Sequence, residues 1–210
     1  GGSDSIWGRE GNDQLFGEAG IDFFRGFSGN DHMDGGDGDS DKVSYDMDEN
    51  YGATSGIVAN LTSGQVIDGY GDTDTVVNIE QLAATSFDDF VIGNNFANKI
   101  QGLSGNDEIS GYAGDDQLYG GDGSDRLDGG AGDDILNGGA GNDTAVYWGA
   151  EIDFNVEIGS NEVSVTQIST GFVDTLYGIE KLEFRDDGNV SYYTFFEQIF
   201  GGVDGEFLIG

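Results

Sequence analysis

A nine-residue repeat constrains this sequence more than any other feature. Residues 93–143 divide into the lines GNNFANKIQ, GLSGNDEIS, GYAGDDQLY, GGDGSDRLD, GGAGDDILN and GGAGND. Each line supplies a glycine-rich turn, an acid or amide at its sixth place and, where complete, an apolar residue at its eighth place. Residues 8–43 follow the same pattern, and a fixed period repeated in this way is typical of a solenoid.

Two columns of residues stay in step through both blocks of the repeat. The eighth place is expected to point into a core, and it holds Ile6, Leu15, Phe24, Met33, Val43, Val91, Ile100, Ile109, Leu118, Leu127, Leu136 and Ala145. The sixth place holds Asp4, Asp13, Asp22, Asp31, Asp41, Asp89, Asn98, Asp107, Asp116, Asp125, Asp134 and Asp143.

A coil of very short strands explains both columns. We expect each nonapeptide to form a six-residue turn and a three-residue strand, with two nonapeptides completing one turn of the coil. Residues 18 apart then stack on one edge, which places Asp107 beside Asp125. Stacked carboxylates repel each other unless a cation lies between them. Calcium suits this arrangement, because it accepts six to eight oxygen ligands in an irregular shell of carboxylates and carbonyls.

Composition narrows the class of protein and its partners. The 210 residues include 41 acidic and 7 basic ones, and the formal charge is -34. This charge opposes a compact state unless cations bind, and it disfavours nucleic acids and anionic membranes, which are bound through Lys and Arg. The 39 glycines and the absence of proline suit turns and strands, while the absence of cysteine excludes disulfides and thiolate metal sites. No apolar run approaches about 20 residues, so we expect no membrane insertion.

At these residues the chain resembles the RTX family of hemolysin-type calcium-binding nonapeptide repeats, whose pattern is G-G-x-G-x-D-x-U-x. The resemblance implies an all-β fold, a calcium-bound parallel β-roll in two blocks, with several calcium ions, about five to eight, between its turns. It also implies a secreted bacterial protein, extracellular or at the cell surface, exported by type I secretion machinery. Because the sequence begins partway through a nonapeptide, we expect it to be a fragment of a larger protein.

The resemblance assigns roles to residues of the repeat. The sixth-place carboxylates become calcium ligands, namely Asp13, Asp22, Asp31, Asp41, Asp107, Asp116, Asp125, Asp134 and Asp143. Asp4 and Asp89 stand in the same column at the starts of the two blocks, where the pattern is less complete. The carbonyl groups expected to complete the shells belong to Gly102, Gly105, Gly111, Gly114, Gly120, Gly121, Gly123, Gly129, Gly130, Gly132 and Gly138.

Three departures mark the opening of the second block as a cap. Asn98 replaces the acid, Phe96 replaces the fourth-place glycine, and residues 84–87 contain no glycine. We therefore expect ions between the aspartate pairs 107/125, 116/134, 125/143, 13/31 and 22/41, and poorer sites at the pairs 4/22, 89/107 and 98/116.

Two segments abandon the nine-residue period and alternate as strands do. The chain divides into a first roll block (1–43), a β excursion (44–83), a second roll block (84–146) and a C-terminal β cap and tail (147–210). The excursions end alike, in DTVVNIEQL and DTLYGIEKL, and Tyr45 and Tyr147 each follow the last repeat aspartate by four residues. We infer one unit used twice, in which antiparallel strands cover an exposed end of the roll. The apolar residues 192–200 are expected to dock as a cap or to belong to a secretion signal.

The segment 37–48 offers a competing interpretation. It begins like an EF-hand calcium loop, but Lys42 stands where that loop needs glycine and Asp48 where it needs glutamate. We prefer a repeat turn that is bulged by one extra residue. A flexible acidic tail is disfavoured, because the apolar eighth place would have no role in it.

The sequence indicates a calcium-binding module that folds on meeting extracellular calcium after secretion, stabilising a larger protein and aiding its export. One alternative is a segment of an adhesin that binds surface polysaccharide, suggested by Tyr51 and Tyr70. Another is the export module of a secreted protease, lipase or alginate-modifying enzyme. We expect no enzyme within the chain, because His32 is its single histidine and no G-x-S-x-G motif is present.

Overall fold

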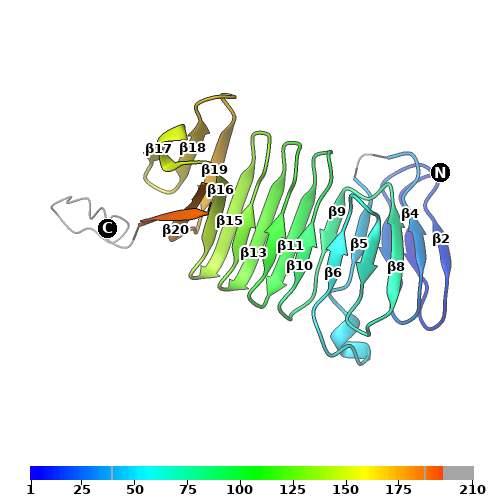
Figure 1. Ribbon diagram of the computed structural model, residues 1–210. Coiled ribbons are helices and arrows are strands. Elements are labelled where there is room, and N and C mark those ends of the chain that lie inside the picture. Colours follow the sequence, from blue (N-terminus) through cyan, green and yellow to red (C-terminus); the bar gives the residue numbers. More distant parts are fainter. Residues whose placement is uncertain (39, 187, 196–210) are drawn as a thin grey trace.

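Short strands stack side by side into an elongated roll in the computed structural model, which describes residues 1–38, 40–186 and 188–195 (Figure 1). The described strands form two sheets. The first contains, in spatial order, β1 (Ser5–Trp7), β3 (Phe23–Arg25), β5 (Lys42–Ser44), β9 (Gln81–Ala83), β11 (Lys99–Ser104), β13 (Gln117–Gly123), β15 (Ile135–Gly141), β19 (Val173–Tyr177), β18 (Val163–Gln167) and β17 (Phe154–Ile158).

The second sheet follows the other side of the roll. It contains, in spatial order, β2 (Gln14–Phe16), β4 (His32–Asp34), β8 (Thr73–Val77), β7 (Gln65–Ile67), β6 (Val58–Asn60), β10 (Phe90–Ile92), β12 (Glu108–Ser110), β14 (Arg126–Asp128), β16 (Thr144–Trp148), β20 (Lys181–Asp186) and β21 (Asn189–Thr194). Two short 3-10 helices lie in the excursions, η1 (Asp48–Tyr51) and η2 (Glu151–Asp153).

The strand register confirms that two nonapeptides complete one turn. In the first sheet Ile100 lies opposite Leu118, which in turn lies opposite Leu136. In the second sheet Ile109 lies opposite Leu127. Each of these steps is 18 residues and each of these pairs is parallel, so the all-β parallel roll predicted from the sequence is confirmed.

The eighth-place side chains fill the space between the two sheets. All but Ile6 are at most 8% exposed, as predicted. They join one continuous apolar cluster that also includes residues of both excursions, such as Val66 and Val165. The two repeat blocks therefore share a single core.

The strands β11, β13 and β15 are longer than the three residues that the repeat predicted. They have six, seven and seven residues and continue through the glycines that follow the eighth place. Their extra pairs, such as Gly121 with Gly139, form because glycine backbones approach closely without side chains. The expectation of uniform three-residue strands is thus wrong on this edge of the roll.

Backbone conformation explains why the fourth place of the repeat is glycine. There φ lies at 123° in Gly105 and 147° in Gly123, a region that side chains with a Cβ atom rarely enter. A Cβ atom on Gly123 would also strike the carbonyl oxygen of Gly105 in the turn below. The second place is more tolerant, since Leu103 and Tyr112 adopt a φ of 82° there.

The first excursion covers the end of block one, as expected, but block two then continues the stack from its other side. Strand β8 pairs in parallel with β4, β7 is antiparallel to both β8 and β6, and β6 pairs in parallel with β10. In the other sheet β9 lies between β5 and β11. No end of the roll is therefore exposed between the two blocks in the described part of the chain.

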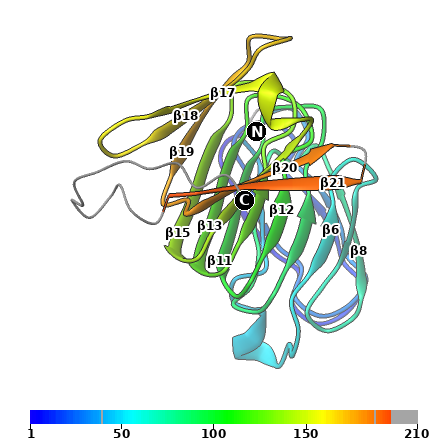
Figure 2. The same ribbon diagram turned by 60° about the vertical axis from the view of Figure 1, so that its left-hand side comes forward.

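The second excursion closes the C-terminal end of the roll, as predicted (Figure 2). Strands β19 and β20 add parallel strands to β15 and β16, and β18, β17 and β21 add antiparallel ones. The two similar segments occupy exchanged sheets: β8 belongs to the second sheet, whereas its counterpart β19 belongs to the first. The inferred unit is thus used twice. Its second copy is shifted by half a turn of the roll, so corresponding strands lie in opposite sheets.

The segment that resembled an EF-hand loop forms a bulged repeat turn. Phe23 lies opposite Lys42, a step of 19 instead of 18 residues, and the backbone N–H of Asp22 donates to Asp41 Oδ1 at 2.7 Å. Despite the extra residue, β5 keeps its register with its neighbours: Val43 lies opposite Phe24 and Leu82.

The C-terminal expectation is tested only in part. Residues 192–194 belong to β21, which pairs with β20, while residues 196–210 lie outside the described structure. Among the described residues, no helix has the length and apolar character needed to span a membrane.

Candidate metal centre between the turns of the roll

From Asp22 onwards in block one and from Asp107 onwards in block two, each sixth-place aspartate accepts a backbone hydrogen bond from the turn that precedes it. The backbone N–H of Asp107 donates to Asp125 Oδ1 at 2.9 Å, and the N–H of Asp125 donates in the same way to Asp143 at 2.9 Å. The N–H of Asp116 donates to Asp134 Oδ1 at 2.8 Å on the opposite edge. In block one, Asp13 donates to Asp31 at 2.8 Å. The predicted pairs are therefore brought together as ladders of carboxylates.

The second oxygen of these carboxylates is left without a protein partner. Oδ2 is buried and accepts no hydrogen bond in Asp13, Asp22, Asp31, Asp107, Asp116, Asp125, Asp134 and Asp143. A buried carboxylate oxygen without a partner is costly, because it has lost its water and gained nothing in return. Eight positions repeat this arrangement, so the fold itself leaves a row of places for a cation or a proton.

Backbone carbonyls lie beside these oxygens. A Cβ atom on Gly102 would touch both Asp107 Oδ2 and the carbonyl oxygen of Gly120, 18 residues later. The same relation joins Gly120 to Asp125 Oδ2 and to the carbonyl oxygen of Gly138. A first-place glycine is thus needed to leave room for one carboxylate oxygen and one carbonyl oxygen, which are the ligand types that calcium prefers.

The predicted loop carbonyls fall into two groups. Those of Gly111, Gly120, Gly129 and Gly138 point at the first-place glycine of the preceding turn, beside its sixth-place side chain. Those of Gly105, Gly114, Gly121 and Gly123 instead face the glycine one turn further on, along the stack. The remaining predicted residues are Gly102, which gives the carboxylate room, and Gly130 and Gly132, which have left-handed backbones.

Burial raises the pKa of the ladder carboxyls from Asp107 to Asp143 in block two. Desolvation is the largest cause throughout, and neighbouring carboxylates add to it. The pKa rises to about 7 in Asp107, about 8 in Asp116, and about 6 in Asp134 and Asp143. Without a cation, the folded turns thus favour protonated acids, and a bound cation would have to displace those protons.

The column members at the block starts differ from the others. Asp4 is exposed. Asp89 has both oxygens satisfied, because Ile57 N–H donates to Oδ1 at 2.6 Å and Thr85 N–H donates to Oδ2 at 2.9 Å. Asn98 is buried but neutral, and its N–H still donates to Asp116 Oδ1 at 2.7 Å. These three positions keep the ladder but offer no buried carboxylate oxygen without a partner, which fits their poorer match to the repeat.

Four acidic residues that the sequence analysis did not single out complete the ladders. The N–H of Asp31 donates to Asp74 Oδ1 at 2.9 Å, and that of Asp134 donates to Asp174 Oδ1 at 3.1 Å. The N–H groups of the last repeat aspartates donate likewise to glutamates: Asp41 to Glu80 at 3.0 Å and Asp143 to Glu180 at 2.8 Å.

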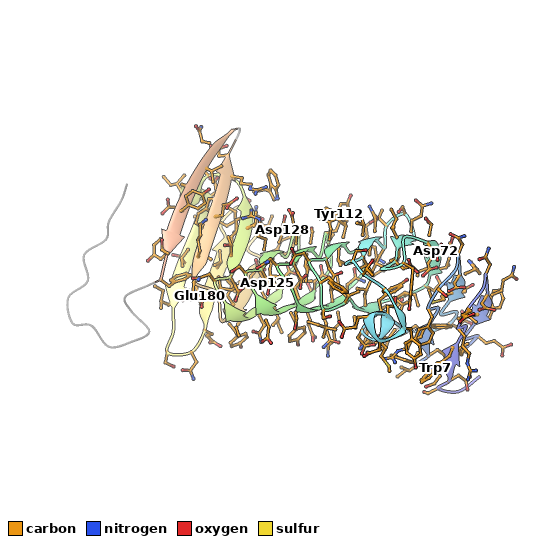
Figure 3. All side chains as sticks on the ribbon, turned by 90° about the horizontal axis from the view of Figure 1, so that it is seen from below. Trp7, Asp72, Tyr112, Asp125, Asp128 and Glu180 are labelled. Atoms are coloured by element: carbon orange, nitrogen blue, oxygen red, sulfur yellow. The ribbon has the colours of Figure 1, made fainter. Side chains whose placement is uncertain are left out.

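These acids belong to the two similar segments that end the excursions. Figure 3 shows one of them, Glu180, on the side of Asp125 that faces the second excursion. The similarity of the segments DTVVNIEQL and DTLYGIEKL was the signal that could have found them, since the two acids of each segment, Asp74/Asp174 and Glu80/Glu180, are among the identical positions.

A tyrosine hydroxyl donates a hydrogen bond to Asp74, the acid that ends the ladder formed by Asp13, Asp31 and Asp74. Tyr45 is 1% exposed, and its hydroxyl donates to Asp74 Oδ2 at 3.0 Å. This oxygen corresponds to the Oδ2 atoms that have no protein partner elsewhere in the ladder. The hydroxyl thus gives this oxygen a protein partner, and the ladder ends on a neutral donor.

Among the described residues, no three His, Cys, Asp or Glu side chains converge on one point. A cation in the roll would therefore be held by at most two carboxylates, with carbonyl oxygens supplying the other ligands. His32 lies on β4 with its ring against Phe16. Of the tyrosines that suggested a sugar site, Tyr51 is 61% exposed, whereas Tyr70 is half-buried and donates its hydroxyl to the Asp48 carbonyl.

Comparison with known proteins gives a family model and several similar solved structures. The family model for the RTX calcium-binding nonapeptide repeat (4 copies) matches residues 1–24, 7–40, 83–118, 92–127 and 110–145. No curated protein matches the chain. Among solved structures, the extracellular lipase LipA from Serratia marcescens is similar over 85% of this chain and 36% of its own length, with 20% identity and a TM-score of 0.31.

Proposed function

Because the chain belongs to the family of RTX calcium-binding nonapeptide-repeat proteins, we propose that it is a module whose folding is triggered by calcium. The observation that carries the proposal is the row of buried Oδ2 atoms without a protein partner. In the absence of a cation these carboxylates oppose the fold, and calcium between the turns removes that opposition. The ligands are the nine sixth-place aspartates predicted from the sequence, together with first-place glycine carbonyls.

The expected energy is sufficient for such a switch. Calcium sites of extracellular modules have dissociation constants of about 0.1 to 1 mM. At calcium concentrations one to ten times that value, each site contributes roughly 0.4 to 1.4 kcal/mol. With about five to eight ions the sum is on the order of 2 to 11 kcal/mol, which is comparable with the whole stability of a domain.

Circular dichroism of the purified chain tests the proposal. We expect a largely unfolded spectrum in EGTA and a β-rich spectrum in millimolar calcium, with millimolar magnesium as the control for ionic strength. Magnesium should fail, because it demands a tighter octahedral shell than irregular turns offer. A β-rich spectrum already present in EGTA at pH 8 would contradict the proposal.

We further propose that this switch serves secretion through type I machinery. In a calcium-poor cytosol the chain, with its charge of -34, would remain unfolded and able to pass a narrow channel. Outside the cell, calcium would drive folding and stabilise the protein that carries the module. The test is export of the larger protein with the sixth-place aspartates of block two changed to Asn: export should continue, but the secreted material should remain sensitive to protease.

A second candidate function, polysaccharide binding, is favoured by a hollow beside the second excursion. Tyr112 and Trp148 are 52% and 63% exposed, and both line it together with Gln167 and Asp128. Aromatic faces with adjacent polar groups suit sugar rings. If this is correct, Trp148→Ala should weaken binding to bacterial polysaccharides by at least tenfold in calorimetry, while Trp7→Ala should not.

A further inference from the structure

Two buried aspartates of the first excursion repeat the signature of the ladder outside the nonapeptides. Asp48 begins η1 and Asp68 follows β7, and each is 1% exposed. In both residues Oδ2 is buried and has no hydrogen-bond partner. Within the described residues, every other carboxylate oxygen of this kind belongs to a sixth-place aspartate. The nonapeptide pattern gives no reason for these two.

The loops that carry the two aspartates are tied together. The hydroxyl of Tyr70 donates to the Asp48 carbonyl at 3.0 Å, while its backbone N–H donates to Asp68 Oδ1 at 3.0 Å. The N–H of Thr54 donates to the Gly69 carbonyl at 3.1 Å. These bonds hold together the loops that carry the two carboxylates and leave both Oδ2 atoms unused.

Within the described residues, no ion pair joins Asp48 or Asp68 to a basic side chain. Burial and then the charge of Asp68 are the largest causes that raise the pKa of Asp48 to about 8. Arg25 opposes this shift, but its guanidinium is bound to Asp46 Oδ1 at 2.6 Å. Two buried carboxylates that act on each other need either a shared proton or a cation.

The second excursion provides an internal comparison. It has the same tyrosine and the same closing acids, but the positions that correspond to Asp48 and Asp68 hold Ala150 and Ile168. The position of Asp48 is counted three residues after the tyrosine, and that of Asp68 six residues before the closing aspartate. The acid pair is therefore not needed to build the excursion or to end a ladder.

We propose that Asp48 and Asp68 hold a calcium ion within the first excursion, separate from the ions between the nonapeptides. Carboxylate Oδ2 atoms from two tied loops, with backbone carbonyls and water completing the shell, match the irregular oxygen ligation that calcium accepts. The ion would fasten the excursion that joins the two blocks. The inference extends the proposed function, since it adds a site that the repeat pattern does not contain.

Native mass spectrometry of the calcium-saturated chain tests this proposal, because it counts bound ions as integers. The variant D48N/D68N should bind one calcium ion fewer than the wild type. The matched control E10Q/E151Q removes two exposed acids and should keep the wild-type number. Calorimetry of the same proteins should show the loss of one site with the others retained, and circular dichroism in calcium should confirm that the variants fold.

The outcomes separate this proposal from the proposed function. A wild type that binds no calcium would overturn the proposed function. If the wild type binds several ions and D48N/D68N binds the same number, the acid pair shares a proton instead, and the new site is refuted. Should the double variant fail to fold, D68N alone is measured: loss of one ion, or tenfold weaker binding of one ion, supports the site, and an unchanged titration refutes it.

Discussion

The two excursions share a tyrosine and two closing acids but occupy different positions in the roll. Comparing them separates the features that end a ladder of carboxylates from the features that join two repeat blocks. Both supply an aspartate and a glutamate that accept the N–H groups of the last repeat aspartates. The first excursion then offers strands to the next block, whereas the second adds antiparallel strands and closes the roll. The closing acids alone therefore do not end the solenoid. Whether the roll continues depends on the strands that lie beside them.

The largest expected effect comes from a cavity in the core at the place where the first excursion joins the two blocks. Leu82 is fully buried between Val43 and Ile100, which belong to different blocks. Leu82→Ala should cost about 2 to 5 kcal/mol and separate the unfolding of the two blocks. Leu182→Ala, at the closing end, should lower stability without such a split. Calcium-saturated thermal unfolding followed by calorimetry checks both, and a single transition in Leu82→Ala would break the distinction between joint and end.

A second prediction tests whether the closing glutamates contribute equally to stability in the two excursions. Glu80→Ala and Glu180→Ala each leave the N–H of a buried aspartate, Asp41 or Asp143, without that acceptor. Each change should cost about 1 to 3 kcal/mol, the usual penalty of an unsatisfied buried group. Denaturant unfolding in saturating calcium gives the two values. Costs that differ by more than twofold would show that the two copies are not equivalent.

A third prediction concerns the hydroxyl of Tyr45, which bonds to Asp74 at the end of its ladder. Tyr45→Phe deletes the bond to Asp74 Oδ2 and should destabilise the protein by about 1 to 2 kcal/mol. Tyr51→Phe, on an exposed ring of the same excursion, is the matched control and should be nearly neutral. Equal stabilities of the two variants in urea would argue that the hydroxyl does not stabilise the end of the ladder.

The smallest effect concerns pH. Burial raises the pKa of both closing aspartates, Asp74 and Asp174, to about 7. A raised acid pKa means that the folded state holds a proton the unfolded state releases, so this contribution to stability is lost as pH rises from about 4 towards 7. Asp74→Asn removes this loss. Its stability relative to wild type should rise by about 1 kcal/mol between pH 6 and 7 in excess calcium.

The variant Asp174→Asn then tests whether the closing aspartates of the two excursions behave alike. The two variants should show the same slope of stability against pH, because the two pKa values have the same leading cause. A flat difference between Asp74→Asn and wild type over this range would contradict a raised pKa at the end of the ladder.

The local chemistry of the roll could be predicted from the sequence. Glycines at the fourth place and apolar residues at the eighth place are fixed by φ angles and by core burial, which are set within one nonapeptide. The 18-residue register and the acid ladder followed from the period alone. Asp89 and Asn98 keep the ladder but lack the buried, unpartnered carboxylate oxygen, as the weaker pattern there suggested, so the ladder was largely visible in the sequence.

Long-range pairing decided the rest. Nothing in residues 44–83 indicated that β6 would pair with β10 while β8 paired with β4, since parallel partners are chosen by the surfaces that must be covered and not by local pattern. The similar endings of the excursions were visible, but the role of Glu80 and Glu180 required the carboxylates to be placed against a backbone about 40 residues away. The sequence by itself thus determined the repeating turn and its ladder of acids. The tertiary structure decided where the ladders end and how they join, because those contacts depend on which open edges meet.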